Sequence, residues 1–240
     1  MLKRILLKIS GEGFCGADGY GIDKTELEYI AESIKYVVDT GVQIAVVVGG
    51  GNIMRGKQLC ALGIDRAKAD SVGMIGTLIN ALILQDELER KNINAKVLST
   101  LFIQQLVEPY VLSKCIEYLN NKIVVILPGG TGYPYFTTDT AAALRAVEIK
   151  ADILLKATKV DGVYSDDPMV NKDAKKFTHL TYLDVLHKNL KVMDATAITL
   201  CMENNVPISV FSIRESQNIQ NIVKGKKIGT FIGSSEDAVR

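Results

Sequence analysis

The residues Lys8-Ile9-Ser10-Gly11 bring a cation, a hydroxyl and a glycine together directly after the apolar run Ile5-Leu6-Leu7. The run is typical of a buried strand, so we expect a strand to end near Lys8. Strands of open α/β sheets deliver the residues at their carboxyl ends to the crevice where ligands bind. Lys8 is therefore a candidate for binding an anion, although a lysine at this place is also typical of a solvated rim.

The glycines after Lys8 match a dinucleotide-binding pattern only in part. The segment Gly11 to Gly16 has the spacing G-x-G-x-x-G after a first strand. In that motif a helix opens within the glycines, and an acidic residue at the end of the second strand binds a ribose hydroxyl. Here the helix-capping signal comes only at Asp23, and the second apolar run ends in Val48-Gly49. We therefore do not favour dinucleotide binding.

Three consecutive glycines, Gly49-Gly50-Gly51, follow the second apolar run. The segment Gly51 to Gln58 matches a P-loop except at its last position, where Gln58 replaces the Ser or Thr that binds Mg²⁺. Backbone without a Cβ can approach a phosphate closely, and Arg55 adds a planar set of donors suited to phosphate oxygens. A plain turn is the alternative, but it needs fewer glycines, so we favour anion binding.

Two further strand ends carry polar, glycine-bearing segments. The segment Gly129 to Asp139 leads glycines, hydroxyls and aromatic rings into a helix near Asp139, whose free N–H groups and positive dipole favour a phosphate. The segment Lys156 to Pro168 combines lysines, carboxylates and Tyr164, a potential stacking ring. Four such ends in one parallel sheet converge on a shared crevice, which two phosphorylated ligands can occupy side by side.

Helices and strands alternate along the chain around these segments. The capping box Asp23 to Glu26 predicts a helix that Gly41 ends. A longer helix is predicted from Arg66 to Arg90, with an inward face made by Val72, Ile75, Leu78, Ile79, Leu82 and Leu88. Shorter helices are predicted near Ser113, Asp139, Leu183, Ala195 and Ser216.

Apolar runs of strand length follow most of these helices. After the first strand they lie at residues 42–48, 95–98, 123–127, 153–155, 208–211 and 229–232. Alternation of this kind predicts an α/β fold in which a mostly parallel sheet lies between helical layers. We expect residues 1–240 to form one domain.

The composition limits the kinds of partner. The chain has 28 basic and 27 acidic side chains, so no global field attracts it to nucleic acid or to a membrane. Its four cysteines are widely spaced and it has only two histidines, which argues against a disulfide framework or a zinc site. No leader follows Met1, and no window approaches the roughly twenty apolar residues of a membrane span. We expect a soluble, unprocessed protein in reducing cytoplasm, with His179 and His187 on its surface.

Together the motifs resemble the amino acid kinase family, and within it the bacterial enzymes that phosphorylate UMP. The resemblance runs nearly end to end and rests on Lys8 to Gly11, Gly49 to Asn52 with Arg55, Gly130 to Asp139, Lys156 to Val163 and Lys191 to Asp194. It implies a three-layer αβα sandwich with a central, mostly parallel sheet. It also implies transfer of the γ-phosphoryl group of ATP to UMP, which gives UDP and ADP in pyrimidine nucleotide biosynthesis.

The resemblance implies ligand contacts by position. Those to ATP are Lys8, Ile9, Ser10, Gly11, Gly51, Arg55, Thr158, Tyr164 and Asp167. Those to UMP are Gly50, Asp70, Thr131, Gly132, Tyr133, Pro134, Tyr135, Phe136, Thr137 and Thr138, with Asp70 near the ribose. The N-terminal part would mainly bind UMP and oligomerise, and the C-terminal part would mainly bind ATP.

Cofactor, assembly and regulation are implied in the same way. Mg²⁺ would be carried with ATP and would need no separate metal site on the protein. The resemblance also implies a cytoplasmic homohexamer that GTP activates and UTP inhibits. The segment Gly16, Ala17, Asp18, Gly19, Tyr20 and Gly21 resembles the family's GTP-response loop.

Two positions depart from the pattern of these relatives. Tyr133 stands where they often carry Asn, and Pro128-Gly129 replaces a Ser-Ala pair. Both departures bear on uracil recognition or on the coupling between subunits.

Transfer to a phosphate acceptor needs no strong general base, because the acceptor oxygen is already anionic near neutral pH. Repulsion between two anions is the difficulty, so we expect catalysis by positioning and charge neutralisation, with Lys8, Arg55 and backbone amides in these roles. Asp139 and Asp194 either orient lysines or metal-bound waters, or cap helices.

Two other functions stay open from the sequence. One is a kinase for a carbamate, a carboxylate or another phosphate acceptor. The other is a non-catalytic nucleotide sensor, against which the joint presence of Lys8 and Asp194 argues.

Overall fold

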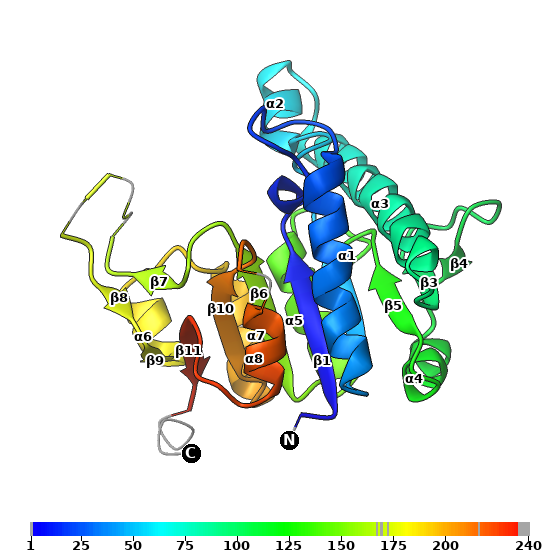
Figure 1. Ribbon diagram of the computed structural model, residues 1–240. Coiled ribbons are helices and arrows are strands. Elements are labelled where there is room, and N and C mark those ends of the chain that lie inside the picture. Colours follow the sequence, from blue (N-terminus) through cyan, green and yellow to red (C-terminus); the bar gives the residue numbers. More distant parts are fainter. Residues whose placement is uncertain (1, 167, 169, 172, 216, 235–240) are drawn as a thin grey trace.

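A computed structural model describes residues 2–166, 168, 170–171, 173–215 and 217–234. In this part of the chain the main sheet has nine strands in the order β4-β3-β5-β2-β1-β6-β10-β11-β9 (Figure 1). They are β1 (Arg4–Ile9), β2 (Gln43–Val48), β3 (Ala95–Ser99), β4 (Glu108–Pro109), β5 (Val124–Leu127), β6 (Ile153–Thr158), β9 (His179–Thr181), β10 (Ile208–Ser212) and β11 (Thr230–Gly233). Neighbouring strands are parallel except β10 and β11, so the predicted mostly parallel sheet is confirmed.

Helices cover both faces of the sheet. One face carries α1 (Lys24–Asp39), α3 (Arg66–Arg90) and α8 (Asn218–Val223). The other carries α4 (Leu112–Asn120), α5 (Thr138–Glu148), α6 (Tyr182–His187) and α7 (Ala195–Glu203). Figure 1 shows α1 and α8 in front of the sheet and α5 and α7 behind it. Each face has its own apolar core, which is the expected three-layer α/β arrangement.

Smaller elements lie near the carboxyl ends of the strands. A 3₁₀ turn (Gly11–Gly13) follows β1, and α2 (Gly56–Ala61) packs against α3. A separate antiparallel pair is formed by β7 (Val163–Tyr164) and β8 (Lys176–Phe177). The helix predicted near Ser216 corresponds to α8, although Ser216 itself lies outside the described residues.

Side chains of β1 alternate between the two cores. Ile5, Leu7 and Ile9 enter the core beneath α1 and α3, whereas Leu6 enters the core beneath α5 and α7. The strand ends at Ile9, so Lys8 lies near its carboxyl end, as the sequence predicted. By the two-residue period of a strand, Lys8 shares the face of Leu6 and points toward the layer that contains α5.

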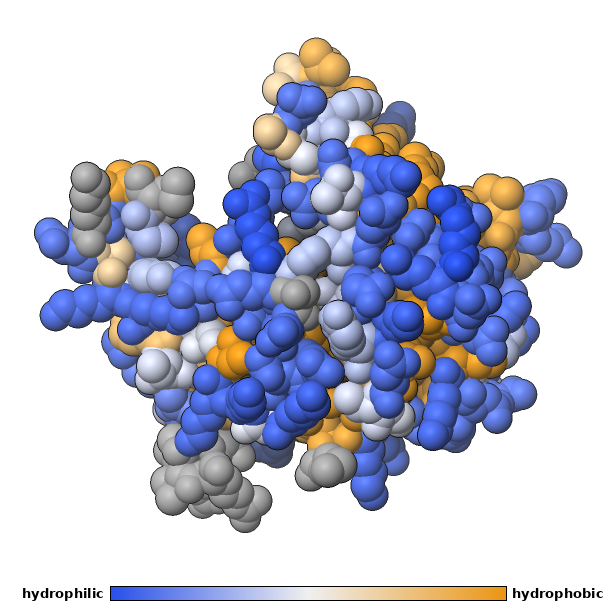
Figure 2. Space-filling view, viewed as in Figure 1, coloured by the Kyte–Doolittle hydropathy of each residue, from blue (hydrophilic) through white to orange (hydrophobic). Residues whose placement is uncertain are grey.

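The predicted inward face of α3 is wrong at three positions. Val72, Ile75 and Ile79 are 38%, 48% and 38% exposed, whereas Leu78 and Leu88 are buried as expected. The reason is that the first half of α3 packs against glycine turns through small and polar residues, Gly76, Thr77 and Asn80. Its apolar side chains therefore face outward, and Figure 2 shows apolar surface along this helix.

Among the described residues, α3 is also the helix that is long and apolar enough to cross a membrane. It has 25 residues, its most apolar window has a mean hydropathy of 1.3, and 39% of that window is buried inside the fold. A core helix of a folded domain meets the same two criteria. The sequence statement that no stretch approaches a membrane span was therefore too strict.

The cysteines and histidines have no shared site. Cys15, Cys60, Cys115 and Cys201 are free thiols, and burial raises the pKa of Cys115 to about 11 and that of Cys201 to about 12. His187 is exposed, as predicted. His179 is instead half-buried, because its ring stacks on Phe231 with the ring centroids 5.8 Å apart.

Candidate active site

Two lysines and one aspartate form a buried cluster at the ends of adjacent strands. Lys8 on β1 and Lys156 on β6 are register partners. Asp139, in the first turn of α5, lies between them: Lys8 Nζ is 2.8 Å from Asp139 Oδ1, and Lys156 Nζ is 2.7 Å from Asp139 Oδ2. The three side chains are only 8%, 12% and 16% exposed. The Asp194 carboxylate also lies close enough to act on Lys156, so two carboxylates hold the two ammonium groups in place. Ammonium groups oriented in this way favour an anion.

Burial and neighbouring charges shift the pKa of Asp139 in opposite directions. Burial alone would raise the pKa of its carboxyl group, but Lys8 and Lys156 outweigh this effect and hold the pKa below the ordinary value of 3.8. For Lys156, burial is the main influence and lowers the pKa of the ammonium group, although Asp139 opposes the shift. Asp139 is therefore a carboxylate throughout the neutral range, ready to orient both lysines.

Asp194 both caps a helix and anchors α5. Its carboxylate accepts from the Ala197 backbone N–H at 3.0 Å, which makes it the N-cap of α7. It also accepts from the hydroxyl of Thr140 at 3.0 Å and from that of Thr137, the N-cap of α5. Asp139 is not a cap, since Thr137 holds that place. Asp194 therefore fixes the helix turn that carries Asp139.

The first two strand ends touch each other through glycine. A Cβ added at Gly11 would lie 2.5 Å from the Gly51 backbone nitrogen and 2.6 Å from Asn52 Oδ1, so only glycine fits there. The Gly49 N–H donates to the Ile9 carbonyl at 2.8 Å, which joins the turn Gly49–Gly51 to the end of β1. Backbone from the ends of β1 and β2 is thus brought together close to Lys8.

Arg55 lies at the rim of the crevice. It is the N-cap residue of α2, its side chain is half exposed, and its guanidinium pairs with Glu12. Its Nε also donates to the Gly51 carbonyl at 3.3 Å. The structure therefore places Arg55 beside the glycine turn, with a solvent-exposed partner that an anion can replace.

Asp70 connects α3 to the loop that follows β5. Its carboxylate accepts from the Tyr135 backbone N–H at 2.8 Å and from Arg66 Nε at 2.9 Å. The guanidinium carbon of Arg66 lies 5.8 Å from the centre of the Tyr135 ring. Tyr133, Tyr135 and Phe136 are exposed on this loop. The residues of α3 and of the loop 131–138 that the resemblance assigns to UMP binding therefore lie close together.

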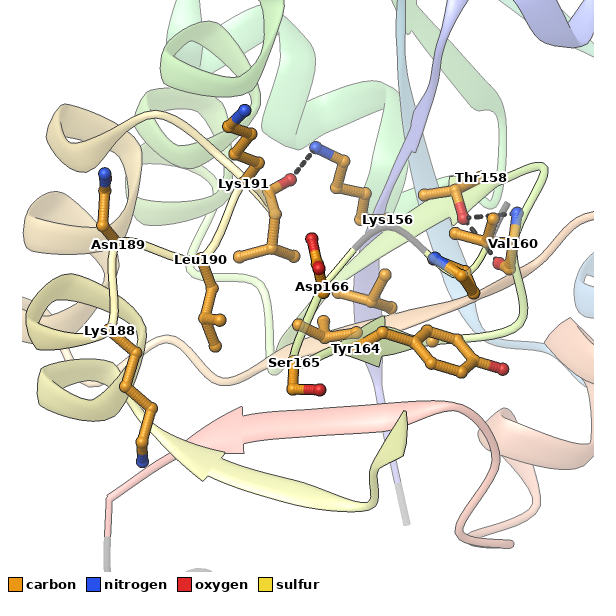
Figure 3. Close-up of a pocket in the computed structure, with 15 residues that line it drawn as sticks. Lys156, Thr158, Val160, Tyr164, Ser165, Asp166, Lys188, Asn189, Leu190 and Lys191 are labelled. Atoms are coloured by element: carbon orange, nitrogen blue, oxygen red, sulfur yellow. Dashed lines mark hydrogen bonds between the residues drawn. The ribbon is translucent and has the colours of Figure 1, made fainter. Parts of the chain in front are cut away.

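A pocket of about 490 Å³ lies beyond Lys156. Its walls come from the end of β6, from β7 and the residues after it, and from residues 188–192 (Figure 3). Lys156 reaches toward residues 191–192 and donates to the Val192 carbonyl, while the Tyr164 ring lies on the opposite side of the pocket. Thr158 and Tyr164, two of the ATP contacts that the resemblance implies, line this pocket, and Asp167 lies outside the described residues.

Sequence analysis placed Lys156 in a candidate ligand-binding segment but gave it no role of its own, and it did not predict the wall made by residues 188–192. The first signal was available, because Lys156 ends the apolar run 153–155 just as Lys8 follows 5–7. For the wall, the motif Lys191 to Asp194 was noted as part of the resemblance, but nothing in its sequence indicates that residues 188–192 face β6. The segment Gly16–Gly21 lies apart from this pocket, with Asp18 and Tyr20 exposed, and the Gly21 N–H donates to the Asn52 carbonyl at 2.9 Å.

The fold and the site define a class of α/β proteins that bind phosphorylated ligands at the carboxyl end of a parallel sheet. The model of the amino acid kinase family matches residues 3–212, and the chain belongs to this family.

Solved structures narrow the comparison to nucleotide kinases. A crystal structure of UMP kinase from Bacillus anthracis is 38% identical, with a TM-score of 0.95 over 98% of this chain and 97% of that one. UMP kinase from Ureaplasma parvum is also 38% identical, with a TM-score of 0.91 over 98% of this chain and 100% of that one. Uridylate kinase from Archaeoglobus fulgidus is 28% identical, with a TM-score of 0.76 over 97% and 100%.

Proposed function

We propose that this protein transfers the γ-phosphoryl group of ATP to UMP, giving UDP and ADP. The observation that carries the proposal is the buried Lys8–Asp139–Lys156 cluster, which holds two ammonium groups on the adjacent strands β1 and β6. Similarity over nearly the full length to two UMP kinases, at 38% identity, supports UMP as the acceptor.

ATP is assigned to the side of the cluster formed by β6. The pocket lined by Thr158 and Tyr164 is large enough for a nucleoside and lies next to Lys156. The phosphates would then extend along Lys8 to Gly11 toward Gly51 and Arg55. Asp167 is assigned to ATP binding as well, on the basis of the family resemblance alone.

UMP is assigned to the side formed by α3 and the loop after β5. Asp70 would bind the ribose, while Gly50 and the loop 131–138 would hold the phosphate and the base. Asp70 already contacts the Tyr135 backbone, which supports a shared site for these two segments. The N-terminal part of the chain would thus mainly bind UMP, the C-terminal part would mainly bind ATP, and the two would act as one domain.

Catalysis would consist of charge neutralisation and alignment. A UMP phosphate oxygen forms a bond to the γ-phosphorus while the bond to the β–γ bridging oxygen breaks, and ADP leaves with that electron pair. Lys8 and Lys156 would bind oxygens of the transferring group, with Arg55 at the rim. Asp139 would hold the two ammonium groups in place, and Asp194 would hold α5, so neither carboxylate needs to accept a proton.

The residues present fit Mg²⁺ that arrives bound to ATP. Asp139 is already paired with two lysines, and Asp194 caps α7. Mg²⁺ commonly keeps several waters and binds mainly through substrate phosphates, which suits such a site. The ion would supply further neutralisation of phosphate charge.

Assembly and regulation belong to the same proposal. The exposed apolar side chains of α3 and of the turn before it support self-association, for which the family resemblance suggests a homohexamer in the cytoplasm. GTP would activate through Gly16–Gly21, and UTP would inhibit. Replacing Asp18 and Tyr20 with Ala should lower the ratio of UDP formation with and without GTP, and an unchanged ratio would refute the loop assignment.

A panel of acceptors tests the function. ADP release from ATP would be measured with UMP, CMP, carbamate and glutamate at equal concentrations. We expect release with UMP to exceed that with each other acceptor at least tenfold. Equal or faster release with another acceptor, or no release with any, would contradict the proposal.

A further inference from the structure

A buried pair of side-chain amides connects α3 to the glycine turn after β2. Asn52 and Asn80 are both 0% exposed. Asn80 Nδ2 donates to Asn52 Oδ1 at 2.7 Å, and Asn52 Nδ2 donates back to Asn80 Oδ1 at 3.1 Å. Each amide nitrogen also donates to a backbone carbonyl, Asn80 to Gly49 at 2.6 Å and Asn52 to Gly21 at 2.8 Å.

This network fixes the orientation of both amides. A primary amide has two N–H donors, and here each nitrogen uses one on its partner and one on a carbonyl oxygen. Turning either amide around would bring oxygen against carbonyl oxygen in a site without water access. A fully satisfied buried network of this kind favours a single geometry.

Backbone packing makes the same part of α3 a rigid reference for the turn. A Cβ at Gly50 would lie 2.7 Å from the Gly73 carbonyl oxygen and from the Thr77 nitrogen, so turn and helix touch backbone to backbone. The side chain of the same Thr77 contacts a second turn: its hydroxyl accepts from the Gly129 N–H at 2.7 Å. The inner face of α3 therefore contacts the turns that follow both β2 and β5.

We propose that Asn80 is a positioning residue for phosphoryl transfer. Through Gly49 it fixes the turn Gly49–Gly51 relative to Lys8, and through Asn52 it fixes the end of the loop Gly16–Gly21 to the same reference. The inference rests on the proposed function, in which this turn lies between the phosphates of the two nucleotides. Asn80 itself touches no ligand in that assignment.

A defect in positioning has a recognisable kinetic signature. The pocket beyond Lys156 and the contacts of Asp70 lie away from Asn80, so each nucleotide keeps most of its binding contacts when the amide is removed. Reacting groups that are misplaced by about 1 Å can lose about 10²-fold in rate. Loss of Asn80 should therefore lower kcat much more than it raises either KM.

The test compares three variants with the wild type. Asn80→Ala removes the amide, and Asn80→Ser is milder because a serine hydroxyl can bond to its own helix carbonyl. Glu87→Gln is the matched control, a buried polar residue on the same helix that pairs with Arg90 and Lys91 away from the turn. We expect kcat to fall at least tenfold in both Asn80 variants, with KM for ATP and for UMP changed less than threefold, and we expect Glu87→Gln to keep the wild-type kcat.

Hydrogen exchange detected by mass spectrometry gives a second measurement without substrates. Peptides covering residues 16–23 and 47–55 should exchange faster in the Asn80 variants, with little change elsewhere. Wild-type kcat, a rise in KM that accounts for the loss, or unchanged exchange in both peptides would overturn the inference. If the Asn80 variants exchanged faster in these peptides but the wild-type protein released no ADP with UMP, the proposed function would be refuted instead.

Discussion

Asp139 gives Lys8 and Lys156 a shared counter-charge without neutralising both. Burying an ammonium group is costly unless it is paired, and here one carboxylate pairs with two such groups. Both ammonium groups are therefore already desolvated and held in place. Stabilisation of developing charge is strongest when donors are oriented before the reaction begins, so this arrangement favours a transferring phosphoryl group.

Lys8→Met tests the role of the charge at this residue. Methionine keeps an unbranched apolar stem, so the core beneath α5 should stay packed. Loss of one preorganised donor typically costs about 3–4 kcal/mol of barrier, so we expect kcat to fall about 10²–10³-fold. Lys24→Met is the control, since Lys24 forms an exposed pair with Glu28 on α1 and lines no part of the proposed site, so this variant should keep the wild-type activity. If Lys8→Met turned over like the wild type and melted normally, Lys8 would have no catalytic role.

The lowered pKa of Asp139 makes the free energy of unfolding depend on pH in the acidic range. Because the folded-state pKa lies below the ordinary value of 3.8, the contribution of this carboxylate is present above that value. It is lost as the pH falls through the folded-state pKa. Urea unfolding between pH 6 and pH 2.5 should therefore show a smaller acid-induced loss of unfolding free energy in Asp139→Asn than in the wild type. Identical pH slopes for both proteins would contradict the charge arrangement.

At the residue scale the sequence predicted which residues form the candidate site better than it predicted their contacts. Lys8 and Asp139 were identified, and the structure brings them together. Lys156, the second lysine that pairs with Asp139, was placed in a candidate segment but was given no role, because contact between β1 and β6 joins residues about 150 positions apart. The sequence also left open whether Asp139 and Asp194 orient lysines or cap helices. In the structure Asp194 caps α7, whereas Asp139 pairs with both lysines.

Helix α3 has two working faces. Its inner face carries Gly76, Thr77 and Asn80 against the glycine turns, and its first turns carry Asp70 toward the loop after β5. Apolar periodicity predicted the helix with its observed bounds, Arg66–Arg90. It could not predict the inward face, because close backbone packing favours small residues and leaves the apolar ones outside.

Asp70→Asn tests the assignment of the acceptor side to this helix. Hydrogen bonds to a charged group contribute about 1.5–3 kcal/mol, so we expect UMP affinity to fall about tenfold or more and ATP affinity to change little. Calorimetric titration of each nucleotide measures both. Asp86→Asn, on the same helix with an exposed Arg90 partner, should bind both nucleotides normally. Equal losses of UMP and ATP affinity would place Asp70 outside the acceptor site.

At the scale of the whole molecule, one surface stands out as apolar. Leu62, Ile64, Val72, Ile75 and Ile79 are exposed on α3 and on the turn that precedes it. Figure 2 shows apolar surface along α3, together with other apolar patches elsewhere on the same face. Adjacent exposed apolar side chains of this kind commonly mark an interface. Since the opposite face of α3 holds the glycine turns, assembly through this helix would bear directly on the site.

Ile75→Glu tests whether this surface holds copies together. A charge buried in an apolar interface is strongly unfavourable, so we expect a lower molar mass by light scattering at the same protein concentration. Leu183→Glu is the control, an exposed leucine on α6 across the sheet, and should keep the wild-type mass. An unchanged mass for Ile75→Glu would rule out this face as the main contact.

The order of strands in the sheet is the part of the fold that the sequence did not specify. Most strands and helices were predicted close to their observed bounds, because each has a local period or capping signal. Pairing between strands is set by contacts distant in the sequence, and short elements such as β4, β7, β8 and β9 have too few residues to show a period. The antiparallel pairing of β11 with β10 was likewise not predicted.

Transfer of radiolabel from ATP to UMP tests the central claim most directly. The purified protein would be incubated with γ-³²P-labelled ATP, Mg²⁺ and UMP, with the Lys8→Met variant as control, and the nucleotides would be separated. We predict that the label moves to UDP in an amount equal to the ADP formed, and that the variant transfers at most about one hundredth as fast. Label that stays in ATP, or that appears as free phosphate and not in UDP, would contradict the account.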